Sequence, residues 1–326
     1  MQASAQAQPN IALIKYWGKR DLELNLPAVG SISVTLDTLW TRTQVVFLDD
    51  AEEDLLILNG EPAAAEQQRR VSAYLDLIRT KAGVQTRARV DTENNFPTAA
   101  GLASSASGFA ALTVASAEAL GLALPPGELC ELARQGSGSA PRSLFGGFVE
   151  MSRGRLEDGS DAVAHQILSP DEWPLEVVVA LTSLSPKSVG STAGMYRSQE
   201  SSPFYEGWTR TADADLDEAR AALVSKDFER LANVSEFSCL KMHAVALASR
   251  PPLIYWNPAT LQALERVREL RREGVPVFFT IDAGPQVKAI SAPGYSGVVA
   301  EALGELDGVQ DVTTSGLGPG ARLIGS

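Results

Sequence analysis

The stretch with the clearest chemical signature runs from Asn94 to Gly108 and reads NNFPTAAGLASSASG. Small residues, glycines and hydroxyl side chains stand here at the start of a long apolar run, which predicts a helix over residues 102–122. The free N–H groups and positive dipole end of a helix start favour an anion, and small residues let a phosphate chain approach the backbone. Taken alone, the stretch fits a phosphate-binding loop and the start of an Ala-rich core helix equally well.

Further segments place charged or hydroxyl side chains beside small residues or at strand ends: Asn10–Asp21, Gly136–Arg142, Gly190–Gly194 and the turn at Asp282. A lysine such as Lys15 at the end of a buried strand is costly unless it is paired. Arg142 can hold a carboxylate or phosphate through two hydrogen bonds, and Asp282 can orient a hydroxyl or accept its proton. Each feature by itself also has a structural explanation, as a strand-edge lysine, a surface turn, a helix cap or a turn aspartate.

The elements that must position these residues follow from the hydrophobic pattern. Strands are predicted at 9–16, 31–36, 43–48, 55–58, 85–92, 145–151, 162–168, 175–181, 275–281 and 309–314. Helices are predicted at 63–82, 102–122, 127–134, 202–224, 226–247, 257–273 and 294–306. Residues 136–142 are predicted to be a loop and the first eight residues a frayed tail. The order indicates an α+β N-terminal half and a more helical C-terminal half, divided near residue 185.

Composition excludes several classes of protein. The net charge of -12 and the pI near 4.8 argue against a nucleic-acid-binding surface. With two cysteines and two histidines, neither a disulfide framework nor a Cys- or His-rich metal site is expected. No signal-peptide pattern and no long apolar run is visible, so a cytoplasmic protein without a membrane span is expected. His243 stands in a predicted helix and is expected to be packed or capping rather than catalytic.

In this order, the segments resemble the GHMP superfamily of small-molecule kinases and, within it, the diphosphomevalonate decarboxylases. The resemblance covers nearly the whole chain and rests on Asn10–Asp21, Leu24–Pro27, Ser31–Thr35, Asn94–Gly108, Gly136–Gly147, Ser191–Met195, Pro251–Tyr255 and Asp282–Pro285. It implies a GHMP kinase-like two-domain α+β fold. A ribosomal protein S5 domain 2-like N-terminal domain would span residues 1–185, and a ferredoxin-like C-terminal domain residues 186–326.

The family implies an ATP- and Mg²⁺-dependent reaction in the mevalonate pathway of isoprenoid biosynthesis. Mevalonate 5-diphosphate is phosphorylated on its tertiary 3-hydroxyl and then loses phosphate and carbon dioxide, giving isopentenyl diphosphate. Asp282 resembles the catalytic aspartate, Lys15 its cationic partner and Arg142 the group that holds the substrate carboxylate. Such residues supply the positioning and charge neutralisation on which phosphoryl transfer depends. The resemblance also implies a homodimer.

The family's remaining site residues carry over by position. The resemblance implies that the substrate is bound by Tyr16, Lys19, Arg69, Ser137, Ser139, Arg142 and Ser191. It implies that ATP is bound by Asn95, Pro97, Ala100, Gly101, Leu102, Ala103, Ser104, Ser105 and Ser107, with Ser105 near the Mg²⁺. Arg69 is assigned only from its spacing to Asn59–Glu61. The chain departs from the family pattern at Ala28–Gly30, where some members are more polar.

Two other functions stay open. The first is a sister activity, a phosphomevalonate decarboxylase or a mevalonate 3-kinase; Lys15 with Asp282 favours complete decarboxylation, and Lys19 with Arg69 favours a diphosphate. The second is a GHMP-fold ligand sensor without turnover, which is expected to lack Asp282 or the phosphate loop, and this chain has both. A hydrolase that uses Ser139 is disfavoured, since no suitably placed histidine is visible.

Overall fold

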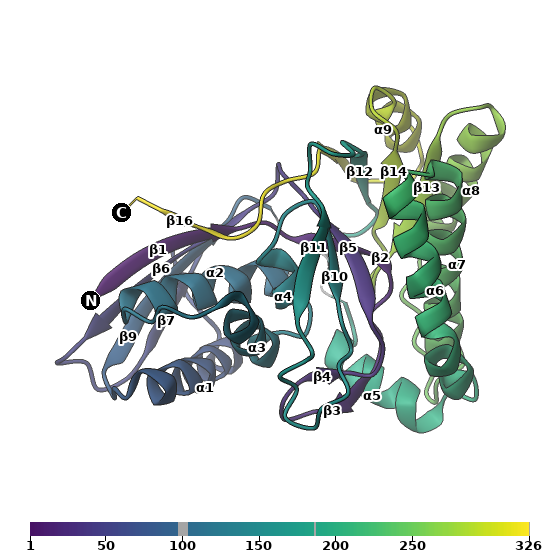
Figure 1. The fold of residues 1–326 in the computed structure, drawn as a ribbon. Helices are drawn as coiled ribbons and strands as arrows, with labels where there is room; N and C mark the ends of the chain where they lie inside the picture. Colours follow the sequence, from purple (N-terminus) through teal and green to yellow (C-terminus); the bar gives the residue numbers. More distant parts are fainter. Residues whose placement is uncertain (97–103, 186, 326) are drawn as a thin grey trace.

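The computed structural model describes residues 1–96, 104–185 and 187–325, and Figure 1 shows their arrangement. The N-terminal half builds a six-stranded sheet in the order β16-β1-β6-β9-β7-β8. Its strands are β1 (Gln2–Ala7), β6 (Thr41–Leu48), β7 (Leu55–Leu58), β8 (Glu61–Pro62), β9 (Arg87–Asn94) and β16 (Arg322–Ile324). The helices of this half are α1 (Ala65–Ala82), α2 (Ser104–Ala119) and α3 (Pro126–Gly136). Helix α2 packs on β1 and β6, so its first residues stand at an edge of this layer.

A second sheet lies in the middle of the molecule, in the order β11-β10-β5-β2 (Figure 1). Its strands are β2 (Asn10–Ile14), β5 (Ser31–Thr35), β10 (Phe148–Met151) and β11 (Ala164–Leu168). A short ribbon of β3 (Lys19–Asp21) and β4 (Leu26–Pro27) and the short helix α4 (Ala140–Ser143) adjoin it. Every residue of β2 and β5 is buried, so the end of β2 delivers Lys15 into the interior.

The C-terminal half is a four-stranded sheet, β13-β14-β12-β15, with helices beside it. The strands are β12 (Glu176–Leu181), β13 (Val277–Ile281), β14 (Val287–Ser291) and β15 (Asp311–Ser315). The helices are α5 (Ser191–Ser201), α6 (Tyr205–Ser225), α7 (Phe228–Leu247), α8 (Pro258–Arg272) and α9 (Ser296–Gly304). One apolar core joins the two halves, because Ile11 and Phe148 pack in the same cluster as Val177 and Phe278.

Most of the predicted helices and strands are confirmed, and the main errors lie at the chain ends and in one loop. The first eight residues are not a frayed tail, because β1 pairs with β6 along its whole length and with β16. Its alternate small residues are buried, with Ala5 and Ala7 fully enclosed. The predicted loop at 136–142 partly folds as α4. The short strands β3, β4, β8 and β16 and the buried strand β14 had not been predicted.

The division of the chain near residue 185 stays a prediction. Strand β12 precedes this position and already pairs with β14 and β15 of the C-terminal sheet. Strand β16, in contrast, returns from the C-terminal half to the N-terminal sheet. Over the ranges that the structure describes, no helix is long and apolar enough to cross a membrane.

Candidate active site

A cavity of about 930 Å³ gathers side chains that are far apart in the sequence. The predicted site residues that line it are Lys15, Tyr16, Lys19, Ser104, Ser105, Ser137, Ser139, Arg142, Ser191 and Asp282. Pro97, Ala100, Gly101, Leu102 and Ala103 lie outside the described residues. The cavity therefore combines segments from both halves of the chain in a single site.

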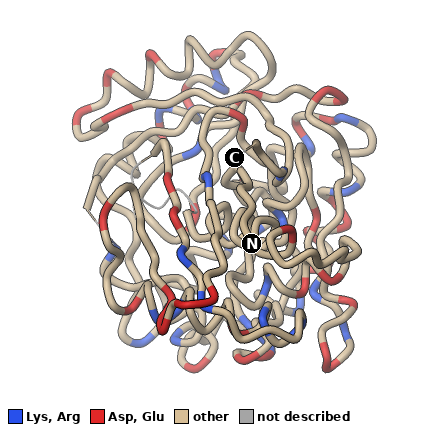
Figure 2. Tube along the Cα trace, turned by 90° about the vertical axis from the view of Figure 1, so that its left-hand side faces the viewer, with Lys and Arg blue, Asp and Glu red and all other residues tan. Residues whose placement is uncertain are grey.

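The charge of the cavity is opposite to that of the whole chain. The chain has 28 Lys and Arg against 40 Asp and Glu, and in Figure 2 both signs are spread over the trace. The charged residues that line the cavity are Lys15, Lys19, Arg70, Arg142 and Lys187 against Glu66 and Asp282. A concave surface lined by one sign of charge concentrates ligands of the opposite sign. The cavity thus suits a polyanionic ligand in an otherwise acidic protein.

Asp282 and Lys15 form an ion pair where two buried strands end. Asp282 follows β13 and Lys15 follows β2, and Lys15 Nζ lies 2.7 Å from Asp282 Oδ1. The Lys15 side chain is 1% exposed and also donates to the Ala12 carbonyl at 2.8 Å, whereas 26% of the Asp282 side chain is exposed. The carboxylate therefore faces the cavity while its cationic partner is held rigidly in the wall.

A second lysine approaches the same carboxylate from β14. Lys288 Nζ lies 3.3 Å from Asp282 Oδ2, and the Lys288 side chain is 1% exposed. Burial by itself raises the pKa of Asp282, but the charges of Lys15 and Lys288 outweigh it and hold this pKa well below its usual range. Asp282 is consequently held as an ionised carboxylate, which can accept hydrogen bonds.

Arg142 is fixed in the wall of the cavity by two side chains of the central sheet. Its Nε donates to Asn10 Oδ1 at 3.1 Å and its Nη1 to Ser31 Oγ at 2.7 Å. Burial lowers the pKa of the guanidinium to about 10, and the nearby charge of Asp282 acts against this shift. Arg142 thus stays charged near neutral pH in a setting of low dielectric, where a bound carboxylate is held strongly.

Hydroxyl and ammonium groups cover the side of the cavity formed by β3 and α5. Lys19 Nζ donates to Thr192 Oγ1 at 3.3 Å, and Lys187 Nζ donates to Ser191 Oγ at 2.8 Å. Burial lowers the pKa of both lysines. The Tyr16 hydroxyl is buried and has no hydrogen-bond partner among the described residues. Since buried polar groups are normally paired, this hydroxyl is available to a polar ligand.

Three predicted residues lie outside this cavity. Asn95 connects loops, because its side chain accepts from the Trp40 N–H at 2.7 Å and donates to the Thr38 carbonyl at 2.8 Å. Ser107 is buried against the N-terminal sheet, with its Oγ 2.7 Å from Thr41 Oγ1.

The third is Arg69, and the structure places its neighbour Arg70 in the cavity instead. Successive residues of a helix point about 100° apart, so a shift of one residue in the assignment by spacing selects a different face of α1. Arg70 Nη2 donates to the Gly136 carbonyl at 2.7 Å, which fixes it beside Ser137.

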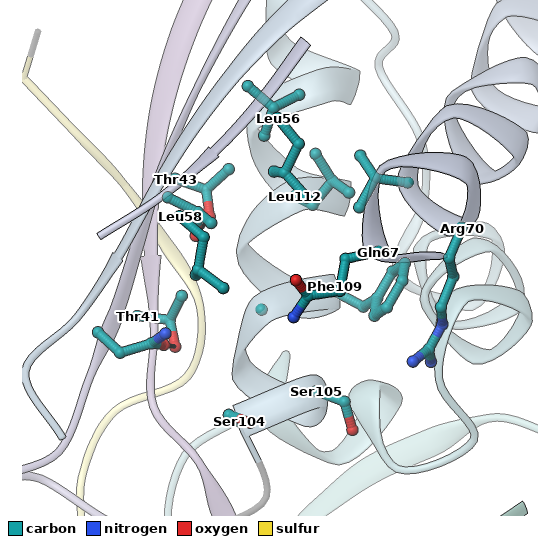
Figure 3. Close-up of a pocket in the computed structure, with 15 residues that line it drawn as sticks. Thr41, Thr43, Leu56, Leu58, Gln67, Arg70, Ser104, Ser105, Phe109 and Leu112 are labelled. Carbon is teal, nitrogen blue, oxygen red and sulfur yellow. Dashed lines mark hydrogen bonds between the residues drawn. The ribbon is translucent and has the colours of Figure 1, made fainter. Parts of the chain in front are cut away.

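A smaller cavity of about 240 Å³ adjoins the first and is shown in Figure 3. Ser104 and Ser105 stand at one end of it, and Leu56 and Leu112 at the other. Its walls are largely apolar, and it shares Arg70, Ser104 and Ser105 with the large cavity. An apolar slot that continues a cationic cavity suits a ligand with a planar ring at one end and phosphates at the other. Sequence reasoning missed this slot because its walls come from five separate elements, β6, β7, β9, α1 and α2.

The comparisons with known proteins agree along the whole chain. Residues 7–164 match the model of the diphosphomevalonate decarboxylase-like N-terminal domain, and residues 177–294 match that of the mevalonate 5-diphosphate decarboxylase C-terminal domain. The chain is 39% identical to the diphosphomevalonate decarboxylase of Candida albicans over 297 residues, which are 87% of this chain and 82% of the relative. The relative from Saccharomyces cerevisiae is also 39% identical, over 301 residues that are 87% of this chain and 76% of that protein.

Solved structures are equally similar. The structure of MDDEF in complex with MVAPP, AMPPCP and magnesium superimposes with a TM-score of 0.93 at 40% identity, covering 100% of this chain and 99% of the other. Mevalonate diphosphate decarboxylase from Staphylococcus aureus gives a TM-score of 0.93 at 39% identity, covering 99% and 98% of the two chains. These similarities extend to both halves of the fold and to the segments that line the cavity.

Proposed function

Since the chain belongs to the diphosphomevalonate decarboxylase family, we propose that the cavity around Asp282 is its active site. The protein is an ATP- and Mg²⁺-dependent enzyme that converts mevalonate 5-diphosphate to isopentenyl diphosphate, ADP, phosphate and carbon dioxide. The observation that carries the assignment of the site is the ion pair of Lys15 and Asp282 in a cation-lined cavity.

The first step is phosphorylation of the substrate's tertiary 3-hydroxyl. Asp282 accepts a hydrogen bond from this hydroxyl and takes its proton as the bond from oxygen to the γ-phosphorus forms and the bond to ADP breaks. Lys15 lies beside the carboxylate and neutralises charge that develops on the transferring phosphoryl group. Because the carboxylate is already ionised and oriented, little reorganisation accompanies the transfer.

The second step is loss of the 3-phosphate and of carbon dioxide. Positive charge develops at the tertiary carbon as the phosphate departs, and the electrons of the bond to the carboxylate form the new double bond. Arg142, anchored by Asn10 and Ser31, holds the carboxylate in line for this departure, with Ser137 and Ser139 beside it. The buried guanidinium also neutralises charge at the phosphate end, where low dielectric strengthens the interaction.

The substrate diphosphate is proposed to lie against Tyr16, Lys19, Ser191 and Arg70, with Arg70 in place of Arg69. Lys187 adds a further cation to this side of the cavity. For ATP, the apolar slot of Figure 3 is proposed to take the base, and Ser104, Ser105 and Arg70 to lie along the phosphates. What supports both assignments is that the two cavities share Arg70, Ser104 and Ser105, so the ATP phosphates would lie next to the substrate.

Magnesium fits a site of few protein ligands. The described residues contain no group of three or more His, Cys, Asp or Glu side chains that could hold a metal ion. Mg²⁺ is often bound through substrate phosphates with one or two protein ligands, and the exposed Ser105 hydroxyl at the cavity is suited to that role. When bound, the ion neutralises charge on the phosphates during transfer.

A steady-state assay tests the proposal. Purified protein should release carbon dioxide and ADP in equal amounts from mevalonate 5-diphosphate, and faster than from the monophosphate. Equal or higher kcat/KM with the monophosphate would indicate a phosphomevalonate decarboxylase. Release of ADP without carbon dioxide would indicate a 3-kinase, and binding without turnover a ligand sensor.

The cellular setting and assembly are proposed from the family resemblance alone. We propose a cytoplasmic homodimer. Sedimentation equilibrium of the purified protein tests the assembly, since a homodimer has twice the chain mass of 34.6 kDa. Fractionation of the source cells tests the location.

A further inference from the structure

Lys288 is a buried cation that the proposed mechanism does not use. It lies on β14, paired with Thr280 of β13, and every residue of this strand is buried. Its ammonium reaches Asp282 Oδ2 at 3.3 Å, whereas Lys15 reaches Oδ1 at 2.7 Å. Lys15 lines the active-site cavity and Lys288 does not, so Lys288 contacts the carboxylate from within the protein wall.

Charge balance at Asp282 does not require a second lysine at this position. Lys15, Lys288 and Asp282 together carry an excess of one positive charge in a buried setting. Lys15 by itself would balance the carboxylate, and a second buried ammonium adds a desolvation cost and repels the first.

What Lys288 supplies is a second fixed contact to the carboxylate. With one ammonium at each oxygen, the Asp282 carboxylate cannot rotate without losing an ion pair. We propose that Lys288 is a positioning residue of the phosphoryl-transfer step, which holds Asp282 in the orientation that receives the 3-hydroxyl. This inference rests on the proposed function of Asp282.

The charged and buried groups around Lys288 act on its pKa in opposite directions. Burial lowers the pKa of Lys288 and the charge of Lys15 lowers it further, while Asp282 raises it. The other ionisable groups around the pair are Cys239 and His243 on α7, and Lys187 and Arg142 across Asp282. Burial raises the pKa of Cys239 and lowers that of His243 to about 3, so both are neutral near pH 7.

The test compares Lys288→Met with the wild type near neutral pH. We expect kcat near neutral pH to fall about tenfold, with KM for ATP and for mevalonate 5-diphosphate within about twofold of the wild type, because only orientation of the reacting groups is lost. The thermal midpoint should stay the same or rise.

Lys241→Met is the matched control. Lys241 pairs one-to-one with Asp215 at 2.5 Å, and neither residue lines the cavity. Its removal leaves a buried carboxylate without its cation, so the thermal midpoint should fall while kcat stays within about twofold of the wild type. Lys288→Gln keeps a donor without a charge and should match Lys288→Met in kcat.

The following results would contradict the positioning role of Lys288. A Lys288→Met kcat within twofold of the wild type would assign Lys288 a structural role. So would a rise in KM as large as the fall in kcat, or a protein less stable than Lys241→Met. Lys288→Gln with wild-type kcat would remove the role of its charge. If the wild type itself fails to release carbon dioxide, the proposed function is wrong rather than this inference alone.

Discussion

Replacing Asp282 by asparagine separates chemistry from nucleotide binding. Asparagine keeps the shape of the side chain but removes the charge that accepts the hydroxyl proton. Loss of a positioned general base lowers a rate by about 10² to 10⁴, which corresponds to about 3–5 kcal/mol of transition-state stabilisation. The apolar slot proposed for the adenine base, and Ser104, belong to the adjoining cavity, which Asp282 does not line. Affinity for a non-hydrolysable ATP analogue should therefore change by less than about threefold.

The same substitution also has a structural effect, which must be measured separately. Lys15 and Lys288 would be left as two buried ammonium groups without their carboxylate, and breaking a buried pair costs about 3–5 kcal/mol. Asp215→Asn provides the control, because it breaks the pair with Lys241 outside the cavity. It should lower stability while kcat stays within about twofold.

The assay is release of ADP and carbon dioxide by folded protein at a temperature well below both unfolding midpoints, with nucleotide affinity from calorimetry. An Asp282→Asn enzyme that keeps more than a tenth of the wild-type kcat would refute the assignment of Asp282. So would a fall in nucleotide affinity as large as the fall in kcat, because the loss would then lie in binding.

Other changes test separate parts of the site. Arg142→Ala should lower kcat at least about a hundredfold, measured as carbon dioxide release, with nearly unchanged affinity for the ATP analogue, because it holds the substrate carboxylate. Arg70→Ala should raise KM for mevalonate 5-diphosphate about tenfold or more, whereas Arg69→Ala should leave it unchanged. The reverse result would favour Arg69, the residue assigned from its spacing to Asn59–Glu61. Burial lowers the pKa of His243 to about 3. Below about pH 6.5 the unfolded chain therefore binds a proton at this histidine, whereas the folded protein does not. The free energy of unfolding in urea should fall by up to about 1.4 kcal/mol per pH unit as the pH is lowered from about 6.5. His243→Gln should flatten that dependence.

The site residues that could be predicted from the sequence are those whose role is indicated by their own type and their immediate neighbours in the chain. Lys15 and Asp282 end strongly apolar strands, and Ser104 and Ser105 belong to a run of small residues before a helix, so type and position already indicate chemistry. The same holds for the helices and strands with a clear period. Strand β1 was missed because its alternate residues are alanines, whose weak tendency to form strands hides a pattern that only packing on α2 explains.

The residues that were missed depend on packing between distant segments. Arg70 and Arg69 are indistinguishable by composition, and only the rotation of α1 about its axis decides which faces the cavity. Lys187 and Lys288 stand in segments without a motif, and their closeness to Asp282 depends on how the loop and β14 meet β13. No spacing rule in one sequence encodes such contacts.

Burial gives the cavity its chemistry as much as residue type does. On a solvent-exposed surface, Arg142 and Lys15 would interact only weakly with an anionic ligand. Here each side chain is almost fully buried and hydrogen-bonded to protein groups, so its position is fixed before a ligand binds. The decarboxylation step depends on this enclosure, since carbon dioxide leaves only if the carboxylate is held while positive charge forms nearby. The second buried lysine beside Asp282 follows the same logic, because its ion pair with Oδ2 adds to the one that Lys15 makes with Oδ1.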